Sequence, residues 1–206
     1  METSACLNYN KNVRRIIFLC LLSALMLLNV QAEAVLSNES RQDITALYNS
    51  NHLDEAYDLI TKTLEEDRDY ELWYLLANIS QDRGDNANAV FFLQKSILLN
   101  PKFDKAHYNL GNIYLEEKRY NMAISEYKRA LKYKKDFPYY YYNTGCAYLG
   151  LKNYKKAASY FKKAAALKND EADFYYNLAY AYKNLQKNKD ADKALEEYNK
   201  IKEKEI

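Results

Sequence analysis

Hydrophobic and polar positions repeat along this chain with a period of 34 residues from residue 70 onward. The clearest marker is a column of alanines at that step, Ala89, Ala123, Ala157 and Ala191. Each period holds two amphipathic stretches of about 13 residues, separated by a short polar turn such as residues 83–86. Two helices of that size form an antiparallel hairpin, and hairpins at a fixed period stack into an array. The pattern therefore predicts an all-α solenoid of stacked antiparallel helix pairs.

The same columns set the expected boundaries of the repeats. We expect helix pairs at residues 70–103, 104–137, 138–171 and 172–206. The last pair ends in a charged helix. A degenerate first repeat occupies residues 35–69, where Leu47 and Ala56 follow the pattern but one residue is missing. An atypical terminal repeat is what a solenoid needs to shield its end from water.

Individual residues predict how the helices begin and pack. Pro138 is placed to be the first residue of a helix, because its fixed φ angle suits that position. Gly111 and Ala123 are small enough to let the two helices of a pair approach closely. We expect Tyr114 and Tyr127 to fill the space beside them.

The first 34 residues differ from the rest of the chain. Basic residues at positions 11, 14 and 15 precede an apolar run at 16–30, and Ala32 and Ala34 follow it. This order is that of a secretory signal peptide, with cleavage expected after Ala34. The localisation that follows is export across a membrane, to the periplasm or the exterior. The alternative is an uncleaved membrane anchor formed by residues 16–30.

Composition narrows the class of partner. The chain has 4 glycines, 2 prolines and 22 tyrosines among 206 residues, which favours helices packed through aromatic side chains. A formal net charge of +2 at pH 7 gives no global field that would attract nucleic acid. We therefore expect no nucleic acid partner, and contact with a membrane only if the leader is uncleaved.

The inventory of reactive side chains predicts no enzyme, no cofactor and no metal site. Removal of the leader leaves Cys146 as the single cysteine, so no intramolecular disulfide is expected. A small half-buried side chain is the first interpretation of Cys146, and a mixed disulfide with a partner is the alternative. His52 and His107 are the two histidines, and His107 is expected to pack in a column of aromatic residues, Trp73, Tyr141 and Tyr175.

The residues of the repeat resemble a known family. Residues 106–114 read Ala-His-Tyr-Asn-Leu-Gly-Asn-Ile-Tyr and are continued by Tyr120, Ala123, Tyr127 and Ala130. This pattern is similar to the tetratricopeptide repeat, and it recurs in register in four repeats. The resemblance implies a right-handed α-solenoid in which the first helix of every pair lines a concave groove.

Two kinds of side chain recur at the positions that the resemblance assigns to the groove. Tyrosine offers flat contact area, and the asparagine amide can both donate and accept hydrogen bonds to an extended peptide. The asparagine rows resemble the ladders by which the tetratricopeptide arm of O-linked N-acetylglucosamine transferase holds peptide. A clamp for a C-terminal carboxylate is not expected, because Tyr139 and other uncharged residues stand where its cations would be. The candidate peptide-binding residues are Tyr74, Asn78, Tyr108, Asn109, Asn112, Tyr142, Asn143, Tyr176 and Asn177.

The resulting hypothesis is an exported scaffold or adaptor that mediates protein–protein interaction by holding an extended segment of a partner in this groove. The alternative is a self-associating structural spacer or assembly factor of an envelope or membrane complex. It rests on the final helix, whose Leu195 and Tyr198 have no later helix to cover them, which would allow a homo-oligomer through that helix.

Overall fold

The computed structural model describes residue 23, residues 40–63 and residues 68–204. The predicted leader, apart from Ser23, therefore lies outside the described residues. None of the described helices is both long and apolar enough to cross a membrane. The chain divides into two compact units, residues 1–60 and 61–206.

The first compact unit contains helical residues 40–49, a turn, and most of helix α2 (Leu53–Lys62). Ile44, Ala56 and Ile60 are its buried residues among those described. The backbone of Asn51 in the turn is left-handed, with φ at 63°. Residues 40–60 therefore form a helix–turn–helix element.

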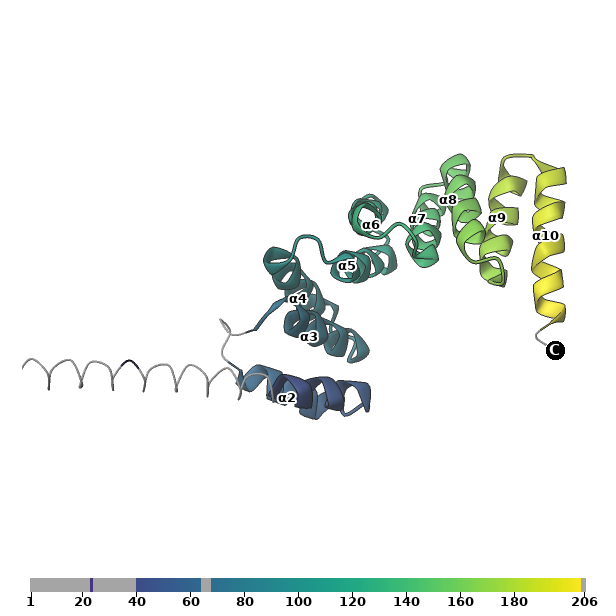
Figure 1. The fold of residues 1–206 in the computed structure, drawn as a ribbon. Helices are drawn as coiled ribbons and strands as arrows, with labels where there is room; N and C mark the ends of the chain where they lie inside the picture. The colour runs from purple at the N-terminus through teal and green to yellow at the C-terminus, as the bar shows by residue number, and fades with distance from the viewer. Residues whose placement is uncertain (1–22, 24–39, 64–67, 205–206) are drawn as a thin grey trace, which may run out of the picture. The chain divides into compact units, whose positions relative to one another are not determined.

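The second compact unit consists of helices in its described part, with no strand between residues 68 and 204. Figure 1 shows the helices following one another in chain order. Their bounds are α3 Tyr70–Asp82, α4 Asn86–Leu99, α5 Asp104–Glu116, α6 Tyr120–Tyr133, α7 Pro138–Gly150, α8 Tyr154–Leu167, α9 Ala172–Asn184 and α10 Asn188–Glu203.

These helices pack as consecutive antiparallel pairs, α3–α4, α5–α6, α7–α8 and α9–α10. The second helix of each pair also packs against the first helix of the next, and α7 touches both α5 and α9. The all-α solenoid predicted from the repeat is thus confirmed.

Local chemistry explains where the helices begin. Asp69 caps α3 by accepting hydrogen bonds from the backbone N–H groups of Glu71 and Leu72, at 3.0 and 2.9 Å. Asn153 likewise accepts from the N–H of Lys156 at the start of α8. Such caps satisfy backbone donors that have no partner within the helix. Pro138 is the first residue of α7, as its position predicted.

The turn inside every pair uses one residue in the left-handed region. Gly84, Lys118, Lys152 and Gln186 have φ between 56° and 76° and lie 34 residues apart. The N–H of the residue after each of them donates to a carbonyl five positions earlier, as in Asn153 to Tyr148 at 2.8 Å. This is the hydrogen bond that closes a helix end with a left-handed residue.

The core depends on size complementarity between two facing columns. A Cβ atom built on Gly111 would lie 2.5 Å from the Tyr127 ring, and one on Gly145 would lie 2.6 Å from the Phe161 ring. The columns pair glycine with an aromatic ring in the two middle repeats. In the repeats at 70–103 and 172–206 they pair alanine with leucine, as Ala77 with Leu93 and Ala179 with Leu195. The predicted close approach at Gly111 is confirmed.

Candidate functional site

The candidate residues lie on the first helices of the four pairs, α3, α5, α7 and α9. We call them the Tyr–Asn rows: Tyr74, Asn78, Tyr108, Asn109, Asn112, Tyr142, Asn143, Tyr176 and Asn177. Most are half-buried, whereas Tyr176 in the last pair is 53% exposed. Their recurrence at equivalent helical positions places them on corresponding faces of successive pairs.

Asparagine side chains connect each pair to the one before it. Asn143 Nδ2 donates to Asn112 Oδ1 at 2.8 Å and to the Tyr108 hydroxyl at 3.0 Å. Asn109 Nδ2 repeats this with Asn78 Oδ1 at 2.7 Å and the Tyr74 hydroxyl at 3.3 Å. The structure therefore brings the predicted residues together as a network between repeats.

The last pair keeps half of this arrangement. Asn177 Nδ2 donates to the Tyr142 hydroxyl at 2.8 Å and to the Asp173 carbonyl at 3.0 Å. A carbonyl can only accept, so this contact fixes the orientation of the Asn177 amide. Cys146 stands where Asn78 and Asn112 stand in earlier repeats, which explains why the amide-to-amide bond is missing here.

The network changes what the asparagines can offer a ligand. We expected each amide to both donate and accept, but the Nδ2 groups are used inside the array. The Oδ1 atoms of Asn109, Asn143 and Asn177 have no hydrogen-bond partner within the described chain. No buried side-chain nitrogen or oxygen in the described part lacks a partner, so these three oxygens reach the surface. They form a row of acceptors.

Aromatic packing holds the tyrosines of the rows. The Tyr108 ring lies 4.8 Å from Tyr140 and 6.2 Å from Phe137, and the Tyr142 ring lies 4.8 Å from Phe174. Burial raises the pKa of the Tyr108 and Tyr142 hydroxyls above the usual value, so both stay neutral at physiological pH. The rows are therefore rigid and uncharged.

Cys146 lies within this face, half-buried beside Tyr142. Burial raises the pKa of its thiol to about 12, because the thiolate would lose its hydration. A thiol attacks or forms a disulfide through its thiolate, so Cys146 is poorly suited to a mixed disulfide. The geometry favours the interpretation of a small packing residue.

A buried polar cluster was missed by the sequence analysis. His107 is only 2% exposed, its Nδ1 lies 2.7 Å from Glu126 Oε2, and its Nε2 donates to the Pro101 carbonyl at 3.1 Å. Arg129 Nη1 donates to the other Glu126 oxygen at 2.9 Å. His107 is thus more than the packing residue that its column predicted.

The sequence did carry a signal for this cluster. Equivalent positions hold aromatic pairs in two other repeats, Trp73 with Phe92 and Tyr141 with Tyr160. Only the repeat at 104–137 replaces both members of the pair with polar residues. Two simultaneous polar changes at facing positions indicate a side-chain pair. The cluster fixes α5 to α6 and to the loop before α5, which is a structural role.

The described residues contain no group of three or more His, Cys, Asp or Glu side chains that could hold a metal ion.

Comparison with known proteins assigns the repeat. Models of the tetratricopeptide repeat match residues 70–103, 92–125, 138–171 and 172–205, and a model described as TPR repeat matches 111–152. Together they cover residues 70–205, about two thirds of the chain. The chain is a tetratricopeptide repeat protein. The resemblance seen in the sequence is confirmed for these repeats.

Individual relatives of this tetratricopeptide protein are distant. Human Tetratricopeptide repeat protein 6 is 36% identical over 55 residues, which make up 27% of this chain and 11% of the human protein. A solved structure of MamA from Desulfovibrio magneticus RS-1 is 20% identical, with a TM-score of 0.74, over 82% of this chain and 96% of that one. A crystal structure of MamA is 22% identical, with a TM-score of 0.72, over 78% and 94%. At these identities the structures show the fold alone.

The family and the fold support a general function. Tetratricopeptide arrays typically bind protein partners, so the family supports a role as a protein–protein interaction scaffold. Scaffolds of this fold are typically not enzymes.

Proposed function

We propose that the protein is an exported scaffold that holds an extended segment of a partner along the Tyr–Asn rows. The row of Oδ1 acceptors on Asn109, Asn143 and Asn177 carries this proposal. Export rests on the order of basic, apolar and small residues in the leader, which either is removed or anchors the protein in a membrane.

The spacing of the acceptors suits an extended chain. Helices that touch lie about 10 Å apart, as α5 and α7 do, so successive asparagines recur at about that step. An extended chain of polyproline II geometry has three residues per turn and rises about 3.1 Å per residue, so every third backbone N–H points to the same side and meets the next asparagine. The acceptors bind main chain, and the partner segment must leave those N–H groups unpaired and free of proline.

The rigidity of the rows supports tight holding. Each asparagine is positioned by two hydrogen bonds to the preceding repeat or to its own helix, so little side-chain freedom remains to be lost on binding. Tyr108 and Tyr142 add contact area, and neighbouring aromatic rings hold each of them in place. Most of the conformational entropy lost on binding is then that of the partner segment.

The test compares partner capture by wild type and by the double variant Asn109→Ala, Asn143→Ala from cells that naturally make the protein. We expect a partner that the wild type recovers and the double variant loses. Because the asparagines also join repeats, a control must weaken the network without changing the surface. Tyr127→Phe does so, since the buried Tyr127 hydroxyl donates to Asn112 Oδ1 at 2.9 Å.

Recovery is normalised to the folded fraction, which circular dichroism measures for each variant. Loss of the partner in the double variant, with retention in Tyr127→Phe, supports binding along the rows. Equal recovery by all three proteins would move the binding surface elsewhere on the array.

A further inference from the structure

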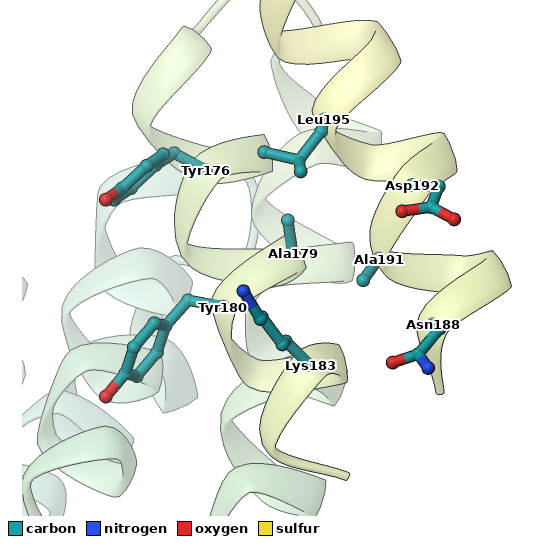
Figure 2. Close-up of a pocket in the computed structure, with 8 residues that line it drawn as sticks. All are labelled: Tyr176, Ala179, Tyr180, Lys183, Asn188, Ala191, Asp192 and Leu195. Atoms are coloured by element: carbon teal, nitrogen blue, oxygen red, sulfur yellow. The ribbon is translucent and has the colours of Figure 1, made fainter. Parts of the chain in front are cut away.

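A hollow of about 570 Å³ opens at the end of the array between α9 and α10. Figure 2 shows that α9 supplies one wall and α10 the other, with Ala179 and Ala191 between them. The lining residues are Tyr176, Ala179, Tyr180, Lys183, Asn188, Ala191, Asp192 and Leu195. The hollow is therefore built wholly from the last pair.

Register shows what this hollow corresponds to elsewhere in the array. Leu195 belongs to the column of Leu93, Tyr127 and Phe161, each of which is 0% exposed, yet Leu195 is 40% exposed. In the earlier repeats the next first helix covers this place, as α9 covers the α7–α8 pair. The hollow at α9–α10 is the same packing surface, and none of the other described helices packs against it.

Two lining residues depart from the pattern of the column. Lys183 stands where α7 has Leu149, and Asp192 stands where α8 has the buried Ala158. They lie on opposite walls of the hollow, and neither has an ion-pair partner among the described residues. An apolar packing surface here carries one positive and one negative charge.

We propose that two copies of this chain associate through this hollow around a two-fold axis. In a two-fold interface, residue i of one copy contacts residue j of the other, and j contacts i. Lys183 of each copy then pairs with Asp192 of the other, while Leu195 and Tyr180 pack between them. The two α9–α10 pairs form a four-helix arrangement in which each copy packs where the next first helix packs on the earlier pairs.

Residues 40–63, the described part of the chain before the four helix pairs, offer no equivalent apolar surface. Among residues 40–63, no large hydrophobic side chain is exposed, so a head-to-tail contact would cover Leu195 with polar groups. A surface that carries both Lys183 and Asp192 can form two ion pairs with a second copy of itself. These two observations favour association of like ends.

The experiment measures mass in solution by sedimentation equilibrium, using the chain as purified from producing cells. Wild type is expected to form a dimer. Lys183→Glu places a glutamate against Asp192 of the other copy at both symmetry-related contacts. Asp192→Lys likewise places two lysines against each other at both contacts. Each change should therefore weaken dimerisation about tenfold or more. Lys102→Glu, an equal change of charge on the exposed α4–α5 loop, is the control and should dimerise normally.

Mixing the two charge variants gives the sharper result. An equimolar mixture of Lys183→Glu with Asp192→Lys restores both ion pairs between unlike copies, so a heterodimer is expected where neither variant dimerises alone. The double variant carrying both changes should also recover the dimer. A wild type that stays monomeric at every concentration, or a mixture that stays monomeric, would overturn the proposal.

The hollow shares Tyr176 with the Tyr–Asn rows, but neither Asn109 nor Asn143 lines it. The Asn109→Ala, Asn143→Ala variant keeps the last pair intact and should dimerise as wild type does. Loss of partner capture and loss of dimerisation are therefore separable results.

Discussion

The pairing of glycine with an aromatic ring in the core gives a quantitative test of the packing. The change is Gly145→Ala on α7, opposite the fully buried Phe161 on α8. The added Cβ would lie 2.6 Å from Phe161 Cε1 and 2.8 Å from Cδ1. Real Cβ atoms do not approach carbon so closely, so the ring or the helices must move.

The magnitude follows from two opposing effects. Overpacking a well-packed core costs about 1–3 kcal/mol, and alanine in place of glycine in a helix gains about 0.5–1 kcal/mol. We therefore expect Gly145→Ala to lower the free energy of unfolding by about 1–2 kcal/mol. Phe161→Leu alone leaves unfilled space and should cost a similar amount, about 1–2 kcal/mol.

The double variant Gly145→Ala, Phe161→Leu is the decisive member of the series. It recreates the pairing of alanine with leucine found in the repeats at 70–103 and 172–206, as Ala77 with Leu93. We expect it to be at least about 1 kcal/mol more stable than the sum of the single changes, because contacting residues couple by about 0.5–3 kcal/mol. Urea unfolding followed by circular dichroism measures all four proteins. Strict additivity would refute size complementarity between the columns.

Three further changes test other parts of the structure. Asn143→Ala removes two hydrogen bonds between repeats and should cost about 1–3 kcal/mol, measured by urea unfolding. An unchanged midpoint would contradict the network. In a chain carrying Cys6→Ser and Cys20→Ser, Cys146 should resist alkylation from pH 7 to 9, because its raised pKa, about 12, keeps the thiol protonated there. Modification at the rate of the urea-unfolded chain would show that the thiol is accessible and ionised. Glu126→Ala leaves the buried imidazole of the polar cluster without its carboxylate and should cost about 1–3 kcal/mol, which a lowered thermal midpoint would reveal.

The fold could be predicted from the sequence because the same packing positions recur in four repeats. The alanine column, the small residue at Gly111 and the helix start at Pro138 are decided by short-range size and backbone rules, and the structure agrees with all three. The positions of the Tyr–Asn rows also follow from the period alone. Their binding role remains a prediction.

The bonding within the rows could not be derived in the same way. The direction in which Asn143 turns its amide depends on Asn112 and Tyr108, which belong to the preceding repeat. Helical periodicity fixes the face on which an asparagine lies but not which of its two ends points inward. The pair of His107 and Glu126 was missed for a related reason. Within its own column each residue is a single polar exception, and the pairing is visible only when the two facing columns are compared.

The left-handed turn residues bear on how the protein can change over evolutionary time. Only Gly84 has the residue type that adopts this backbone conformation without strain, whereas Lys118, Lys152 and Gln186 adopt it at a cost of about 1 kcal/mol each. All three are exposed in turns, and none of them belongs to the Tyr–Asn rows or lines the hollow at α9–α10. Glycine at any of them would strengthen one repeat without altering either surface. The array is thus less stable than its own backbone permits, and it has a simple route by which destabilising changes on its binding faces can be offset.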